Sequence, residues 1–274
     1  MFKRVIVPVD GSDFSWRALG PAAALARQSD AALEVLQVVT LPDDAGPASQ
    51  IVREQLGETG LDADMLARVE VAIETMGDNV ASTIAQRAVD HEGSIVVMSS
   101  VGRGRSAALI GSIAEELLGL LFGPIMVVGP DARIDRPDFR GSLVVTVDGS
   151  ATSESALGLA AAWGIGLEAT PWITLVLDPG DASASDIDES SYPNRLAQRL
   201  SAESNHPVEF EVLRDSNPAH SVAEFAETND ASLIITSTHG RTGLARIRAG
   251  SVAMNIVRRA PCPVVLNRPP DLSD

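Results

Sequence analysis

The chain carries the same sequence pattern twice. Residues 5–12 read VIVPVDGS and residues 143–150 read LVVTVDGS, so Asp10 and Asp148 stand 148 − 10 = 138 positions apart. Residues 95–102 and 233–240 match at the same separation, since 240 − 102 is again 138. A unit of this length is able to bury its own core, unlike the short repeats of a solenoid. The repeat therefore predicts two similar domains joined head to tail.

The domain boundaries follow from the repeat and from local composition. We expect a first domain at residues 1–130, a linker at 131–141, a second domain at 142–268 and a C-terminal tail at 269–274. The linker is placed in a segment rich in proline, glycine and charged residues, a composition that favours irregular structure.

Within each copy, short apolar runs alternate with helix-like segments. In the first copy we expect strands at 4–9, 33–39, 69–75, 95–98 and 125–128, and helices at 15–28, 49–67, 79–90 and 112–121; the second copy repeats this order. The strands are short apolar runs rich in Val and Ile, typical of parallel strands covered by helices on both faces. The predicted fold class is α/β, with two tandem doubly wound, Rossmann-like domains. Ser112 with Glu115, and Asn217 before Pro218, are expected to cap helices.

Charge restricts the choice of partner. The net charge is −16, which argues against a nucleic acid partner because a phosphate backbone requires a basic surface. Residues 231–270 nevertheless contain no Asp or Glu, and several arginines fall in that segment: Arg241, Arg246, Arg248, Arg258, Arg259 and Arg268. A local positive field of this kind suits a small anion, although Arg258, Arg259 and Arg268 are better read as solvated surface residues.

The remaining composition points to a cytoplasmic globular protein. No apolar run approaches the ~20 residues of a membrane span. The amino terminus reads as a strand and not as a signal peptide, and the single cysteine, Cys262, has no partner for an intramolecular disulfide. Aromatic residues make up 4% of the chain, so the cores must consist of Ala, Val, Leu and Ile.

A glycine-containing loop after the fourth strand is the strongest candidate site. In an open parallel sheet, ligands bind beyond the carboxyl ends of the strands. In the second copy Ser237, His239 and Gly240 are followed, after residues 241–249, by Gly250-Ser251 at a predicted helix start. Free backbone N–H groups and the positive end of the helix dipole make such a start a phosphate site. Ser251 is equally suited to donate its hydroxyl to phosphate or to cap the helix.

The sequence resembles the universal stress protein family, and specifically its tandem-domain members, over nearly the whole chain. The resemblance rests on VPVDGS at 7–12, VDGS at 147–150, THGRTGL at 238–244, GSVA at 250–253 and APCPVV at 260–265. It implies a five-stranded sheet of order 3-2-1-4-5 in each domain and pairing of the two units through their last strands. The fused copies would then form an intrachain pseudo-dimer through strands near 125–128 and 264–266, and a homodimer stays possible.

The resemblance also implies a nucleotide site. The ATP-binding branch of the family carries Gly, two residues, Gly, nine residues, Gly and then Ser or Thr. The implied contact positions are Asp148, Val176, Ser237, His239, Gly240, Gly250, Ser251 and Val252 in the second domain, and Asp10, Val38, Gly102, Gly111 and Ser112 in the first.

Both copies depart from that pattern. Ser99 and Ser237 stand where it has its first glycine, and the first copy is one residue short in the loop, because 250 − 111 is 139 and not 138. A serine side chain would enter the space of the ribose and phosphates. We therefore place the ligand, ATP or ADP with a possible Mg²⁺, in the second domain.

Other chemistries find little support in the sequence. Residues 102–107 fit G-x-G-x-x-A but follow the fourth strand, whereas a dinucleotide fingerprint follows the first, and no P-loop motif is present. The four histidines have no metal-ligand spacing, and no nucleophile with an orienting base stands out, so we assign no catalytic and no metal residues. Asp10 and Asp148 could assist Mg²⁺, but a ribose contact or capping of the following turn is simpler.

Three functions remain open from the sequence. The first is a non-catalytic stress-response regulator that binds ATP or ADP and changes conformation or assembly. The second is a slow ATPase that uses the same loop, with Arg241 or Arg246 steadying the transferred phosphate. The third is a stress protein that binds no nucleotide and acts through protein contacts. Regulatory partners are not identifiable from the residues.

Overall fold

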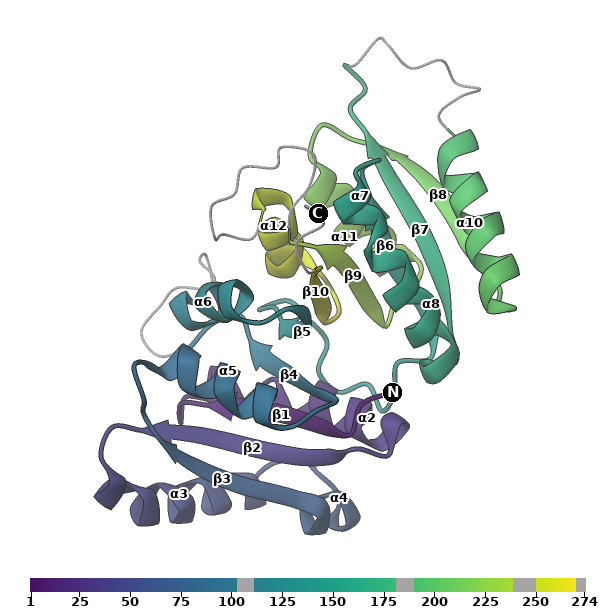
Figure 1. Ribbon diagram of the computed structural model, residues 1–274. Helices are drawn as coiled ribbons and strands as arrows, with labels where there is room; N and C mark the ends of the chain where they lie inside the picture. Colours follow the sequence, from purple (N-terminus) through teal and green to yellow (C-terminus); the bar gives the residue numbers. More distant parts are fainter. Residues whose placement is uncertain (103–110, 181–189, 239–249, 270–274) are drawn as a thin grey trace.

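The strands form one continuous sheet in the computed structural model, which describes residues 1–102, 111–180, 190–238 and 250–269 (Figure 1). The strand order is β3-β2-β1-β4-β5-β10-β9-β6-β7-β8, so each half has the order 3-2-1-4-5. Neighbouring strands are parallel within each half, and β5 and β10 pair antiparallel. The predicted fold class is confirmed. The strands are β1 (Arg4–Val9), β2 (Ala32–Val39), β3 (Val69–Thr75), β4 (Ser94–Ser99), β5 (Gly123–Val128), β6 (Gly141–Val147), β7 (Ala169–Leu177), β8 (Glu209–Arg214), β9 (Leu233–Ser237) and β10 (Val264–Arg268).

Helices cover both faces of the sheet (Figure 1). They are α1 (Asp13–Trp16), α2 (Leu19–Ser29), α3 (Ala45–Gly57), α4 (Ala63–Arg68), α5 (Val80–Asp90), α6 (Ser112–Leu120), α7 (Ala151–Glu154), α8 (Ala156–Leu167), α10 (Ser191–Ser204), α11 (Pro218–Thr228) and α12 (Ser251–Arg259), with the short 3₁₀ helix η1 (Pro42–Asp44) before α3. One core lies under α2 and α8, and a second lies under α5, α6, α11 and α12. Adjacent strand residues such as Val5 and Ile6 enter opposite cores, which is the period of two expected of a strand covered on both faces.

Two predicted helices are each divided in the structure. Residues 15–28 form α1 and α2, and the second half has the same break between α7 and α8, where Leu159 stands at the position of Pro21, so the break does not depend on a proline. Residues 49–67 form α3 and α4, because Asp62 caps a new helix by accepting a hydrogen bond from the Met65 amide at 2.8 Å. The prediction of single helices in these segments was wrong.

The two halves join through their last strands, as the sequence predicted. Val264 lies opposite Val127 and Leu266 opposite Ile125, and Figure 1 shows the two halves meeting at this seam. Arg268, the last residue of β10, donates to the carbonyl oxygens of Leu118 and Gly119 at the carboxyl end of α6, where a cation is favourable, so the expectation that it is a solvated surface residue was wrong. The second half therefore contacts a helix of the first.

The segment between the two halves is held against α2. Arg17 donates to the carbonyl oxygens of Pro130 and Ala132, both at 3.0 Å. Gly20 allows the chain to approach closely, since a Cβ atom there would lie 2.2 Å from the carbonyl oxygen of Ile134. The Phe139 amide donates to the Gln28 side chain at 2.8 Å, and β6 then begins at Gly141.

A charged cluster around the buried Glu34 in the first half is replaced by an aromatic pair at the equivalent described positions of the second. Glu34 on β2 is fully buried and accepts hydrogen bonds from Arg4 at 2.6 Å and from Arg87 on α5 at 3.0 Å. These contacts raise the pKa of the Arg87 guanidinium, the hydrogen bond to Glu34 being the largest cause. The 138-residue offset (172 − 34 = 138) places Trp172 and Phe225 at the positions of Glu34 and Arg87, and these rings pack edge to face at 5.7 Å.

Cys262 should resist thiol reagents in the folded protein. Its side chain is completely buried, and burial raises the pKa of the thiol to about 12. At about pH 8, where an ordinary thiol of pKa about 8.5 is partly ionised, we expect negligible labelling by DTNB until denaturant is added. Labelling in native buffer at the rate seen in denaturant would contradict this expectation.

In the described residues, no helix has both the length and the apolar character needed to cross a membrane.

Candidate functional site

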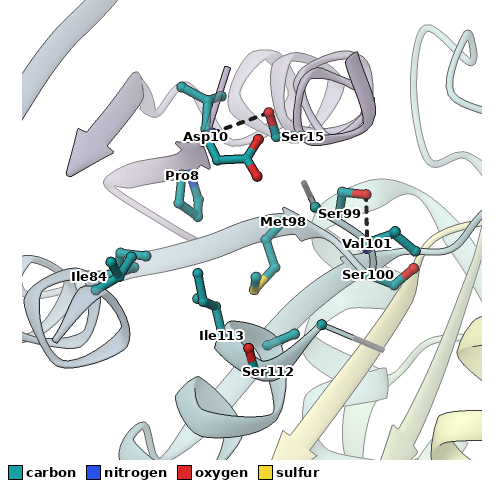
Figure 2. A pocket seen from close by; sticks show the side chains of 15 residues that line it. Pro8, Asp10, Ser15, Ile84, Met98, Ser99, Ser100, Val101, Ser112 and Ile113 are labelled. Atoms are coloured by element: carbon teal, nitrogen blue, oxygen red, sulfur yellow. Dashed lines mark hydrogen bonds between the residues drawn. The ribbon is translucent and has the colours of Figure 1, made fainter. Parts of the chain in front are cut away.

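A pocket opens at the carboxyl ends of the strands in each half, on the face covered by α5 and α6 or by α11 and α12. Pocket one has a volume of about 240 Å³ and is lined by Pro8, Val9, Asp10, Ser15, Val80, Ile84, Met98, Ser99, Ser100, Val101, Gly102, Gly111, Ser112, Ile113 and Ala114 (Figure 2). Pocket two has a volume of about 350 Å³ and is lined by Thr146, Val147, Asp148, Ser153, Val176, Pro218, Val222, Thr236, Ser237, Thr238, Gly250, Ser251, Val252, Ala253 and Ile256. Pocket two falls within the range of small-molecule sites, roughly 300–1,000 Å³.

A tight turn follows the first strand of each half and fixes the aspartate at the pocket edge. Oδ1 of Asp148 accepts from the Ser150 amide at 3.0 Å and from the Ser150 hydroxyl at 2.6 Å. Gly149 has φ = 85°, a conformation that favours glycine, and Ser150 then caps α7. Asp10, Gly11 and Ser12 repeat this arrangement in the first half. One carboxylate oxygen of each aspartate thus caps the turn, as the simpler reading of the sequence expected.

The helix that begins at each pocket has no side-chain cap. Gly250 is the N-cap of α12, and its amide donates to the Thr238 carbonyl oxygen at 2.5 Å. Within the described part of the chain, the first-turn amides of Ser251, Val252 and Ala253 have no hydrogen-bond acceptor, and these residues line pocket two. Such amides, at the positive end of the helix dipole, are suited to bind an anion.

The first half has the same helix start, and one sequence prediction was wrong there. Gly111, not Ser112, is the N-cap of α6, and no side chain caps this helix. Ser112 occupies the first helical position because Gly111 already has the extended backbone of a cap, so the expected pairing of Ser112 with Glu115 does not form. By contrast, α5 and α11 on the same face are capped by Asn79 and Asn217, the second as predicted.

Ser237 stands at the position of the missing glycine but is bonded away from α12. Its hydroxyl donates to the carbonyl oxygen of Thr152 in α7 at 2.8 Å. Ser99 in the first half instead accepts a long hydrogen bond, at 3.4 Å, from the Val101 amide (Figure 2). The extra side chain in the second half is therefore held against α7, and the first-turn amides of α12 stay accessible from the pocket.

The sheet floor differs between the pockets. In pocket two, Thr146 on β6 and Thr236 on β9 are joined by a hydrogen bond between their hydroxyls at 2.8 Å. The equivalent residues of pocket one, 146 − 138 = 8 and 236 − 138 = 98, are Pro8 and Met98, which approach from β1 and β4 in Figure 2. The sequence analysis did not single out these floor residues, although the repeat together with strand alternation points to them.

The structure brings most of the predicted contact residues together in two groups. Asp148, Val176, Ser237, Gly250, Ser251 and Val252 line pocket two, and Asp10, Gly102, Gly111 and Ser112 line pocket one. Val38 does not line pocket one but packs, partly buried, against the second core. His239 and Gly240 lie outside the described residues. That these positions contact a nucleotide remains a prediction.

The titratable residues Asp215 and His220 contact groups at the start of α11. At the start of α11, Asp215 accepts from the Asn217 amide at 2.9 Å and contacts the His220 ring at 3.0 Å. The Asn217 amide and then His220 lower the pKa of the half-buried Asp215 carboxyl. Among the residues the structure describes, no group of three His, Cys, Asp or Glu side chains is placed to hold a metal ion.

The fold and pockets define a tandem doubly wound α/β protein with one candidate ligand site in each half. The model of the universal stress protein family matches residues 1–129 and again residues 140–268. The chain therefore belongs to the universal stress protein family, as its motifs indicated.

Relatives and solved structures agree with this assignment. Universal stress protein Rv1996 of Mycobacterium tuberculosis is 30% identical over 307 residues, which cover 97% of this chain and 95% of the relative. A universal stress protein of Mycolicibacterium smegmatis is 29% identical and is covered to 97%, as is this chain. The crystal structure of a universal stress protein from Archaeoglobus fulgidus has a similar fold, with a TM-score of 0.71, 19% identity and coverage of 98% of this chain and 99% of that one.

Proposed function

We propose that pocket two binds an adenine nucleotide, ATP or ADP, and that the protein is a cytoplasmic, nucleotide-responsive regulator of the stress response. The observation that carries this proposal is the start of α12, where three amides without acceptors in the described structure open into a pocket at the carboxyl edge of the sheet. Membership of the universal stress protein family supports it.

In this proposal the second-half residues have separate roles. The backbone amides of Ser251 and Val252 and the hydroxyl of Ser251 hold phosphate oxygens. Gly250 lets the phosphates approach the backbone. Asp148, fixed by its turn, faces the ribose, while Val176 contacts the base. His239 and Gly240 complete the loop, and Mg²⁺ would accompany the phosphates. The first half, whose loop is one residue shorter, contributes chiefly as a structural partner.

Retained nucleotide is the direct test. The full chain is purified without added ligand and denatured, and the supernatant is analysed for ATP and ADP by mass spectrometry. A thermal-shift titration with Mg-ATP accompanies it, because a ligand at about 100 times its Kd adds about 2.7 kcal/mol to stability. If no nucleotide is released and excess Mg-ATP causes no shift, the proposal fails and a role through protein contacts is left. Phosphate release above that of a Gly250→Val control would show instead a slow ATPase.

Ser251→Asp should abolish nucleotide binding while preserving or raising stability. The residue occupies the first position of α12, where a carboxylate interacts favourably with the helix dipole by about 0.3–1 kcal/mol. The same charge would repel phosphate from the amides of the first turn. We expect no thermal shift with Mg-ATP and an unliganded melting temperature at least equal to that of the wild type.

Ser112→Asp in pocket one is the matched control. It introduces the same charge at the equivalent first position of α6. It should leave the Mg-ATP thermal shift intact. If Ser112→Asp removes the shift and Ser251→Asp does not, the nucleotide site lies in the first half and the assignment of pocket two is wrong.

A further inference from the structure

Two threonine hydroxyl groups on the floor of pocket two form a hydrogen bond with each other and have one further hydrogen to donate. Thr146 Oγ1 donates to Thr236 Oγ1 at 2.8 Å, and Thr236 is 5% exposed. Two hydroxyls carry two hydrogens, and the bond between them uses one. Among the residues the structure describes, no group accepts the second hydrogen, whichever of the two threonines carries it. Thr146 is half-buried and both residues line pocket two, so the pair presents one hydroxyl hydrogen to the pocket.

The residues around this hydroxyl hydrogen indicate which kind of ligand group would accept it. Val176 on β7, Thr146 on β6 and Thr236 on β9 lie on the same face of neighbouring strands, and all three line pocket two. Pro218 and Val222 of α11 line the same pocket. Apolar side chains suit the faces of a flat ring, whereas a hydroxyl among them suits an acceptor atom at the edge of that ring. A buried donor left without an acceptor is costly, so a ligand that lacks the acceptor should be disfavoured.

The first half has lost this donor. Pro8 and Met98 occupy the two equivalent positions in pocket one, and neither side chain has a hydrogen to donate. The pockets share the helix start and the aspartate turn but differ at this point of the floor. Any difference in the ring that they accept should therefore originate here.

We propose that the Thr146–Thr236 pair determines the specificity of pocket two by donating a hydrogen bond to an acceptor atom, a ring nitrogen or an exocyclic oxygen, of a heteroaromatic base. This inference rests on the proposed nucleotide binding and names the part of the site that distinguishes one base from another. Pocket one lacks the pair.

The experiment compares ATP with its 1-deaza, 3-deaza and 7-deaza analogues, in which one ring nitrogen is replaced by CH. Binding to the full chain is measured by calorimetry in a Ser112→Asp background, which silences pocket one. The variant Thr146→Val/Thr236→Val removes both hydroxyls and keeps the branched shape. Thr174→Val is the matched control, because Thr174 is a buried strand threonine that donates to the Val145 carbonyl oxygen at 3.3 Å and does not line the pocket.

With the pair intact, one deaza analogue should bind about tenfold more weakly than ATP, which corresponds to one lost hydrogen bond of about 1.4 kcal/mol. The double valine variant should bind ATP about tenfold more weakly and lose the discrimination among analogues, while Thr174→Val retains it. Equal binding of all analogues with the pair intact, or unchanged discrimination in the double variant, overturns the specificity role while nucleotide binding stands. Absence of ATP binding in the wild type overturns the proposed function, and this inference with it.

Discussion

Glu34→Ala is expected to lower the free energy of unfolding by about 3–5 kcal/mol, a large fraction of the stability of an ordinary domain. Glu34 is fully buried, and its carboxylate receives Arg4 at 2.6 Å and Arg87 at 3.0 Å. Removing the carboxylate breaks its hydrogen bonds to both guanidinium groups and leaves Arg4 and Arg87, both largely buried, with only the more exposed Glu70 and Glu74 as counter-ions. Urea denaturation followed by circular dichroism measures it.

Two variants test whether the loss of stability arises because the Glu34 carboxylate is buried or only because a carboxylate is removed. Glu70→Ala removes a carboxylate that also contacts Arg4, but the Glu70 side chain is 55% exposed, so about 1 kcal/mol or less should be lost. The double variant Glu34→Trp/Arg87→Phe transfers the aromatic pair of the second half and should recover most of the stability lost in Glu34→Ala, since apolar replacements of buried ion pairs are often neutral or better. Equal losses in Glu34→Ala and Glu70→Ala would show that the cluster contributes no more than a surface pair.

Sequence alone was sufficient for the architecture because the repeat and the apolar strands are local, redundant signals. Strands were predicted at 4–9 and 69–75 and lie at those residues, and the pairing of the last strands, which the resemblance to the universal stress protein family implied, is present between β5 and β10. The helix breaks between α1 and α2 and at Asp62 were missed, although Asp62 is a residue type that favours helix caps. The predicted helix bounds followed the period of the apolar residues and not the capping signals of single residues.

The candidate sites were predictable to a different degree. The turn at Asp148 and the start of α12 stand in motifs that are contiguous in sequence, and the structure places both at pocket two. The Thr146–Thr236 pair joins residues 90 positions apart, and its meaning depends on which face of β6 and β9 carries the pocket. Likewise, the bond that holds Ser237 against α7 depends on tertiary packing. Contacts of this kind require the register of the sheet, which a motif does not contain.

Gly129→Ala is expected to weaken the union of the two halves and to cost about 3 kcal/mol, the upper part of the range for overpacking. Gly129 follows β5, and a Cβ atom there would lie 2.0 Å from the carbonyl oxygen of Val257 in α12 of the other half. The obstacle is backbone, which cannot rotate away as a side chain can, so α12 or the seam must shift. Because α12 also lines pocket two, the thermal shift with Mg-ATP should shrink together with the melting temperature.

Gly158→Ala provides the matched control for the same one-carbon addition. Gly158 lies inside α8 with no heavy atom within 4 Å of the added Cβ, so alanine should stabilise the protein by up to about 1 kcal/mol through its higher helix propensity. Thermal melts of the wild type and both variants, at several protein concentrations and with and without Mg-ATP, distinguish the effects. A Gly129→Ala variant that melts like Gly158→Ala and keeps the full ATP shift would mean that the seam adapts without cost and does not position α12. A lower melting temperature with an unchanged ATP shift would mean that the seam holds the halves together but leaves the start of α12, and hence the ligand site, independent of it.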